Sequence, residues 1–330
     1  MPYLGYGTRE RLLVCGRVLE EEGFTPAADA DSRWRNLVRF WKRLESDEVP
    51  LARLRARFFG RESESVSDGE GYFRLAIAPR GRLGPGVWQE VELELQGEEA
   101  VRATARVLVP SRRARFGVIS DIDDTIVASH VGNKVRMILT AVLSNARTRK
   151  PFPGVAAFYR ALHAGVNPFF YISKSPWNLY APLLEYLEIQ ELPLGPLLLR
   201  DIGLRPEKEH KRKAIEDILA TYPKLKFILI GDSGEEDPEI YSAVVHRHPD
   251  RIRAIYIRSV NQKRISQIEK LAQEVSRTGC QLVLAKEAEQ AAAHAAAEGL
   301  IQASELRAVR ADSDSDKSSS KPAVSSGALK

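Results

Sequence analysis

Apolar and polar residues follow two different patterns along the chain, and the change comes near residue 113. Before that point apolar residues alternate with polar ones, a period of two that predicts strands with one buried face. The expected strands cover residues 11–19, 51–59, 71–79, 91–95 and 101–109. Short strands of this kind, joined by glycine-rich turns, are typical of a β-sandwich. We therefore expect residues 1–112 to form a β-sandwich-like domain.

In the second part of the chain, short apolar runs alternate with segments of helical periodicity. The runs cover residues 115–120, 169–172, 227–230 and 254–257, and the helical segments include 154–163, 179–188 and 211–221. Strands that alternate with helices predict a Rossmann-like α/β domain, with a parallel sheet covered on both faces. We expect it over residues 113–309, with the alanine-rich residues 281–309 helical. Residues 310–330 are rich in Ser, Asp and Lys, which predicts a disordered tail.

Two basic segments with helical spacing of apolar residues allow two interpretations each. In the first, Trp34, Leu37 and Trp41 share one stripe among several arginines. It either lies on an anionic membrane surface or packs its aromatic face against the sandwich. The second covers residues 131–150 and is either a small cap over a functional site or an ordinary packed helix. A short basic cap would leave such a site open to bulky anionic substrates.

Composition and charge narrow the function classes only a little. The 330 residues are 44% hydrophobic and 28% charged, as in ordinary globular proteins. A net charge of +5 weakly favours anionic substrates or surfaces and gives no reason to expect nucleic acid. The two cysteines, Cys15 and Cys280, lie far apart and predict neither a disulfide framework nor a zinc site. With no visible signal peptide or membrane-spanning run, we expect a cytoplasmic protein that contacts membranes, if at all, peripherally.

The strongest chemical signal follows the first apolar run of the second domain, in Ser120-Asp121-Ile122-Asp123-Asp124-Thr125. Side chains alternate along a strand, so Asp121 and Asp123 point the same way. Two such carboxylates at the carboxyl end of a parallel strand suit metal-assisted phosphoryl chemistry. A calcium-binding EF-hand is excluded, because Ile126 stands where that loop needs glycine. Neither a G-x-x-x-x-G-K-[ST] phosphate loop nor a G-x-S-x-G nucleophile motif occurs in the sequence.

Three further elements stand at strand ends or at the start of a helical segment. Ser173 follows the run 169–172, and Lys211 begins the helical segment 211–221. Asp232 and Asp237 follow the run 227–230, in Gly231-Asp232-Ser233-Gly234-Glu235-Glu236-Asp237. In this order the four elements resemble the haloacid dehalogenase superfamily, whose phosphatases use D-x-D-x-[TV], S/T, K and G-D-x-x-x-x-D.

The closer resemblance is to the actin-patch-protein type of phosphatidate phosphatase. It is carried by the stretches Ser120–Ile126, Tyr171–Leu179 and Gly231–Tyr241. The stretches Tyr6-Gly7-Thr8 and Gly16-Arg17-Val18-Leu19 resemble the β-rich domain that precedes the catalytic domain in bacterial members. Lys174 departs from the pattern, because a small residue is expected there, and it adds positive charge beside the site.

The resemblance implies catalytic roles for three residues of the first motif and for one lysine. Asp121 attacks phosphorus and becomes an aspartyl-phosphate. Asp123 protonates the leaving oxygen and then deprotonates the hydrolytic water, and Thr125 stabilises the loop that holds Asp123. Lys211 balances the negative charge of nucleophile and phosphate, with Lys213 as the alternative for this role.

The resemblance also implies a magnesium site and a phosphate contact. Mg²⁺ is bound by Asp121, Asp232 and the backbone carbonyl of Asp123. Asp237 either orients this shell or binds the ion directly. Ser173 hydrogen-bonds a phosphoryl oxygen.

The sequence thus predicts a Mg²⁺-dependent phosphatase that hydrolyses a phosphomonoester through an aspartyl-phosphate. The resemblance implies phosphatidate, or a related lipid phosphate, as the substrate and diacylglycerol as the product. One alternative is a phosphatase that acts on soluble metabolites or phosphoproteins. Another is an inactive membrane- or protein-binding scaffold, which would have no need of both Asp121 and Asp123.

Overall fold

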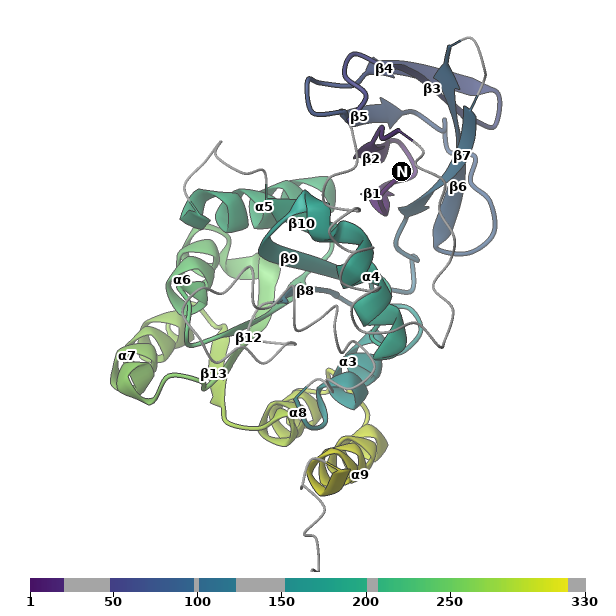
Figure 1. Ribbon diagram of the computed structural model, residues 1–330. Helices are drawn as coiled ribbons and strands as arrows, with labels where there is room; N and C mark the ends of the chain where they lie inside the picture. The colour runs from purple at the N-terminus through teal and green to yellow at the C-terminus, as the bar shows by residue number, and fades with distance from the viewer. Residues whose placement is uncertain (21–47, 98–100, 123–151, 201–206, 320–330) are drawn as a thin grey trace, which may run out of the picture.

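The computed structural model describes residues 1–20, 48–97, 101–122, 152–200 and 207–319, which form two successive sheets with helices around the second (Figure 1). Three predicted features lie outside these residues: the Trp34–Trp41 segment, the cap at 131–150 and the last part of the tail. Among the described helices, none combines the length and apolar character that crossing a bilayer requires.

The N-terminal part is one seven-stranded sheet in the order β4-β3-β6-β7-β1-β2-β5. Leu54, Ala56 and Phe58 are buried while their neighbours are not, so the period-two pattern predicted for these strands is confirmed. The sheet curls until its two outer strands meet, where the Ser65 hydroxyl donates to the Arg74 carbonyl at 3.1 Å. The two layers of the expected sandwich therefore belong to one continuous sheet. Its strands are β1 (Gly5–Gly7), β2 (Leu12–Arg17), β3 (Arg53–Phe58), β4 (Arg61–Val66), β5 (Tyr72–Ile77), β6 (Trp88–Gln96) and β7 (Val101–Leu108).

The second part is the predicted α/β domain, with a six-stranded sheet in the order β10-β9-β8-β11-β12-β13. Every neighbouring pair in it is parallel, so all carboxyl ends lie at one edge. The strands are β8 (Gly117–Asp121), β9 (Phe169–Pro176), β10 (Leu197–Arg200), β11 (Phe227–Asp232), β12 (Ile252–Arg258) and β13 (Gln281–Ala285). The helices are α3 (Val155–His163), α4 (Tyr180–Ile189), α5 (Glu207–Thr221), α6 (Asp237–Arg247), α7 (Ile265–Ser276), α8 (Ala288–Ala297) and α9 (Ala303–Ser319), with 3₁₀ turns at Trp177–Leu179, Pro249–Arg251 and Gln262–Arg264.

Both faces of this sheet are covered by helices, which explains why its strands are apolar without alternation. Val118 of β8 packs in a cluster with α3, α4, α8 and α9, whereas its neighbour Ile119 packs with α5, α6 and α7. Side chains of even and odd position on β8 therefore meet different layers of helices. Asp121 follows Ile119 by two positions, so its side chain is directed to the face that α5 covers.

Two predictions for the C-terminal part are wrong. Residues 281–285 form β13 instead of the start of a helix, because this short apolar run pairs with β12 and completes the sheet. Residues 310–319 belong to α9 and are not a disordered tail. That helix is held by Val309, which is fully buried, and by an ion pair between Lys317 and Glu287. Packing against neighbouring helices outweighs the polar composition on which the prediction rested.

The curled sheet contacts the α/β domain at the segment that follows β9. The Arg17 side chain, largely buried, donates from Nη1 to Asn178 Oδ1 at 3.1 Å, and the ring of Tyr3 stacks on Trp177 at 4.9 Å. Elsewhere along this contact the Leu4 amide donates to the Tyr180 hydroxyl at 2.5 Å. The N-terminal part thus contacts the turn Trp177–Leu179 that follows β9, the strand that carries Ser173 and Lys174.

Candidate active site

The site begins at the carboxyl end of β8, in the middle of the parallel sheet. Asp121 is only 1% exposed and is the register partner of Ile172 on β9, so Ser173 comes next on the adjacent strand. On the other side, Ser120 pairs with Ile230 of β11, two residues before Asp232. The register therefore brings the predicted residues of three strands to one edge, as parallel sheets do at their carboxyl ends.

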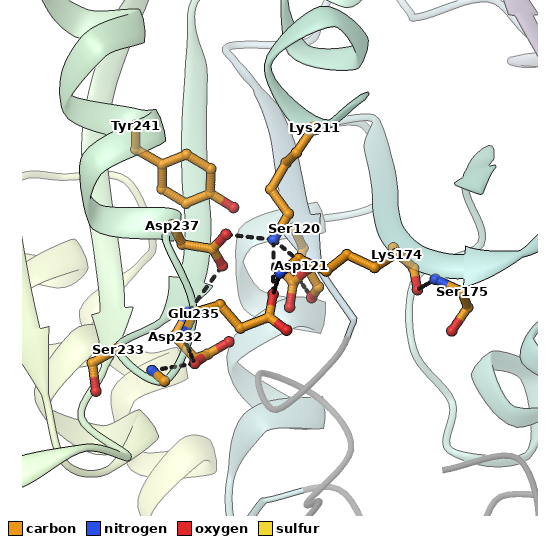
Figure 2. Close-up of polar contacts among 12 residues, drawn as sticks. Ser120, Asp121, Lys174, Ser175, Lys211, Asp232, Ser233, Glu235, Asp237 and Tyr241 are labelled. Carbon is orange, nitrogen blue, oxygen red and sulfur yellow. Dashed lines mark hydrogen bonds and ion pairs between the residues drawn. The ribbon is translucent and has the colours of Figure 1, made fainter. Parts of the chain in front are cut away.

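Lys211 is the cation of this site. It projects from α5, its side chain is 1% exposed, and its Nζ lies 2.7 Å from Asp121 Oδ1 (Figure 2). The same Nζ also donates to Asp237 Oδ1. Lys213 is half exposed and pairs with Asp217 on its own helix at 3.1 Å. Of the two lysines predicted for this position, the structure brings Lys211 to the carboxylates.

The pKa of Lys211 lies well above its ordinary value. Burial alone would lower that pKa, but the attraction of Asp121 and Asp237 outweighs it, and Glu235 adds to it. The lysine is therefore held in its charged form, which is the form that neutralises a carboxylate or a phosphate.

Both carboxylate oxygens of Asp237 accept hydrogen bonds inside the protein. It stands at the first position of α6, where a helix favours a negative charge. Its Oδ2 accepts the backbone N–H of Asp232 at 3.2 Å, and its Oδ1 accepts from Lys211. Gly231 permits this approach, because a Cβ there would lie 2.2 Å from Asp237 Oδ2. These contacts suit the orienting role predicted for Asp237 better than direct binding of an ion.

Three other carboxylates come together as a group that could hold a cation. Asp121, Asp232 and Glu235 each offer an oxygen, and these oxygens lie within 4.8 Å of one another (Figure 2). Asp232 Oδ1 accepts from the backbone N–H of Gly234 at 2.5 Å and of Glu235 at 3.1 Å. Its Oδ2 is buried with no hydrogen-bond partner among the described residues. An oxygen so placed, in an all-carboxylate donor set, fits a hard divalent cation such as Mg²⁺.

The charges of the site lead to the same expectation. Among the residues that the structure describes here, the four carboxylates of Asp121, Asp232, Glu235 and Asp237 face the two ammonium groups of Lys174 and Lys211, which leaves two negative charges in excess when all are ionised. Burial, followed by repulsion from Asp237 and Glu235, raises the pKa of Asp232 to about 7. One divalent cation would balance this excess and restore an ordinary, ionised Asp232.

The remaining predicted residues are placed as follows. Ser173 is fully buried inside β9, which continues to Pro176 and does not end at Ser173 as predicted, and its Oγ accepts the backbone N–H of Ser175 at 3.0 Å. Lys174 Nζ lies 3.0 Å from Glu235 Oε2, which confirms that this lysine adds charge beside the site. Asp123 and Thr125 lie outside the described residues.

Glu235 is the residue that sequence reasoning missed. It lies in the turn between Asp232 and Asp237, where the sequence has four acidic residues within six positions and the motif uses only the first and the last. Its side chain is 8% exposed and contacts both Lys174 and Lys211. The signal that could have identified it is Lys174, because an extra lysine beside a buried site needs an acidic partner.

Asp232→Asn is expected to stabilise the metal-free protein. The raised pKa means that Asp232 contributes stability that is complete below about pH 4 and is lost as pH rises through about 7. Asparagine keeps the acceptor for Gly234 and does not ionise, so the variant should gain on the order of 1–3 kcal/mol at pH 8 and little at pH 4. Urea unfolding in EDTA at both pH values measures this difference.

The exposed Asp250, replaced by asparagine, provides the control and should leave both unfolding curves unchanged. Saturating Mg²⁺ should reverse the order, because only the wild type retains the full donor set. A variant less stable than wild type in EDTA at pH 8 would show that the excess negative charge is not a source of strain.

Comparison with known proteins gives a family match in the α/β part of the chain. Residues 116–259 match the family described as phosphatidate phosphatase APP1, catalytic domain. Phosphatidate phosphatase APP1 of Saccharomyces cerevisiae is 37% identical over 152 residues, 43% of this chain and 26% of the yeast protein. An uncharacterized protein of Schizosaccharomyces pombe is 28% identical over 155 residues, 45% of this chain and 26% of that protein. The chain thus spans about a quarter of the length of these curated relatives.

Among solved structures, a HAD family hydrolase from Deinococcus radiodurans, determined with bound phosphate and sodium, is similar to this chain at a TM-score of 0.32 and 20% identity. The likeness covers 57% of this chain and 99% of the other. A TM-score this low allows nothing to be transferred to the present site. The sequence matches confirm the resemblance predicted from the motifs: residues 116–259 of this chain are similar to the catalytic domain of phosphatidate phosphatase APP1.

Proposed function

We propose that this protein is a Mg²⁺-dependent phosphatase that hydrolyses a phosphomonoester through an aspartyl-phosphate, with phosphatidate or a related lipid phosphate as its substrate. One observation carries the proposal. Asp121 lies buried at a strand end, 2.7 Å from Lys211 Nζ and within a group of three carboxylates. A binding scaffold would gain nothing from keeping such a costly charge cluster below the surface.

In the first half of the proposed reaction, an oxygen of Asp121 attacks phosphorus and a P–O bond to Asp121 forms. The P–O bond to the alcohol breaks, and Asp123 supplies the proton that the leaving oxygen needs. Lys211 and the Ser173 hydroxyl stabilise the charge on the phosphoryl oxygens during this transfer. The alcohol leaves, and Asp121 carries the phosphoryl group.

In the second half, water hydrolyses the aspartyl-phosphate. Asp123 is now a carboxylate and takes a proton from the attacking water. The bond between Asp121 and phosphorus breaks, inorganic phosphate leaves, and both carboxyl groups return to their initial state. Asp237 acts at a distance throughout, because it holds Lys211 and the backbone of Asp232 in place.

A bound Mg²⁺ would be held by Asp121, Asp232 and Glu235, with the Asp123 carbonyl as a further ligand proposed from sequence. The ion would supply positive charge against the phosphoryl oxygens and offset the repulsion between the phosphate dianion and the acidic group. Without it, the two excess negative charges of the site would repel the substrate.

The lipid part of the proposal rests on the matched catalytic family. The yeast relative is named a phosphatidate phosphatase, and the present chain is 37% identical to it over 152 residues. We place the reaction in the cytoplasm, at a membrane surface that supplies the substrate. A soluble phosphomonoester is the alternative substrate.

A substrate panel tests both parts of the proposal. The purified protein with Mg²⁺ should release phosphate from phosphatidate in mixed vesicles, and faster than from glycerol phosphate, sugar phosphates or a phosphopeptide at equal concentration. EDTA should abolish the activity and added Mg²⁺ should restore it. Activity that survives chelation would contradict the metal role, and a preference for soluble esters would contradict the lipid assignment.

A further inference from the structure

An apolar cavity of about 200 Å³ lies between the sheet and the helices α3, α8 and α9. Its walls include Phe158 of α3, Ile230 and Tyr256 of the sheet, and Ala288 and Ala291 of α8. A smaller apolar cavity, of about 150 Å³, already binds benzene in an engineered protein, so this one has room for a somewhat longer hydrocarbon segment.

The cavity reaches the carboxyl edge of the sheet, where Arg258 ends β12, on the face that α3 covers. The Asp121 side chain is directed to the other face at the same edge. Tyr159 lines the cavity, and the Tyr159 hydroxyl lies 2.7 Å from the hydroxyl of Ser120, the residue before Asp121. Ile230 also lines it and is followed two positions later, on the same side of β11, by Asp232. A ligand whose head group lies at the carboxylates would therefore have an apolar space along the same strand.

The polar groups of the cavity suit an anionic amphiphile. Three basic residues, Arg258, Lys286 and Lys317, line the cavity with one acidic residue, Glu287, which pairs with Lys317 at 2.9 Å, so the described lining keeps a net positive charge. Arg258 is also the register partner of Asp232. Ser313 of α9 is 2% exposed, and its hydroxyl has no hydrogen-bond partner among the described residues. An ester carbonyl of an acyl chain would accept a hydrogen bond from such a hydroxyl.

We infer that this cavity is the subsite for the hydrocarbon chain of the phosphate ester that the enzyme hydrolyses. The inference rests on the proposed function, and it adds a place for the chain and a reason for preferring substrates that have one. Chain and head group would then bind together, with the phosphate at Asp121 and the first methylenes against Ile230, Tyr256 and Ala288. A polar alcohol such as glycerol or a sugar would leave the cavity unfilled.

Binding of n-alkyl phosphonates tests the inference without requiring turnover, because their C–P bond is not a hydrolysable ester. Isothermal titration calorimetry with Mg²⁺ present should show Kd falling about two- to fourfold per methylene from ethyl to hexyl phosphonate. The dependence should level off once the chain fills the cavity. All compounds are used below their critical micelle concentrations.

Ala288→Phe should remove this chain-length dependence and leave the Kd of inorganic phosphate unchanged, because the new ring fills the cavity and not the phosphate site. Ala293→Phe is the matched control: Ala293 is exposed on the same helix and should preserve the wild-type series. If Ala288→Phe does not fold, Ala288→Leu replaces it and should shorten the range over which Kd falls.

Equal Kd values for ethyl and hexyl phosphonate in the wild type would overturn the inference, as would an unchanged series in a folded Ala288→Phe. Failure of the proposed function would look different. The phosphonates would then show the chain-length dependence, while the corresponding alkyl phosphates released no inorganic phosphate in the presence of Mg²⁺.

Discussion

Asp121→Asn is expected to abolish phosphatase activity while leaving the protein folded. The amide cannot attack phosphorus, so hydrolysis of an aryl phosphate in the presence of Mg²⁺ should fall by at least about 10⁴-fold. The amide oxygen can still accept from Lys211, and one buried negative charge is removed from a site with two in excess. Thermal unfolding of the variant should therefore occur at or above the wild-type temperature.

Asp217→Asn is the control for this experiment, because Asp217 is a half-exposed aspartate on α5 whose side chain pairs with Lys213 and not with Lys211. Its activity should match the wild type. An acid-quenched wild-type reaction should also carry phosphate on Asp121, detectable by mass spectrometry, and the variant should not. Residual activity of Asp121→Asn near the wild-type level would remove Asp121 from the role of nucleophile.

The sequence predicts which strand ends lie together around Asp121, because that depends only on the parallel strands and their order. The apolar runs ending at Asp121, Ser173 and Asp232 identify three parallel strands, and parallel strands place their carboxyl ends at one edge. The order of the strands then decides which side chains meet, because β9 and β11 pair with β8 on its two sides. Neither step needs any knowledge of side-chain contacts.

Other features depend on contacts that no local pattern reports. Glu235 joins the carboxylate group because the turn after β11 folds back on Asp232, through two backbone N–H groups that donate to its Oδ1. The choice between Lys211 and Lys213 depends on which face of α5 meets the sheet. The predictions of a helix at 281–285 and of a disordered tail from residue 310 are wrong because short or polar segments take their structure from the partners they pack against.

Lys211→Met is expected to damage both activity and stability. Loss of the ammonium group leaves Asp121, Asp237 and Glu235 without their shared buried cation, a change that costs about 3–5 kcal/mol when one partner of a buried pair is removed. The phosphoryl transfer would also lose a preorganised positive charge, about 10²- to 10³-fold in kcat. Urea unfolding and aryl phosphate hydrolysis, measured below the unfolding temperature, report the two losses separately.

Two further variants separate catalysis from folding at this position. Lys213→Met changes the neighbouring exposed lysine of the same helix and should leave kcat and stability near their wild-type values. In the double variant Lys211→Met/Asp237→Asn, one of the carboxylates that contact Lys211 is also neutralised, so a large part of the lost stability should return while kcat stays low. If kcat recovered together with stability, the lysine would be a structural counter-ion for the acidic group and would not stabilise the transferring phosphoryl group.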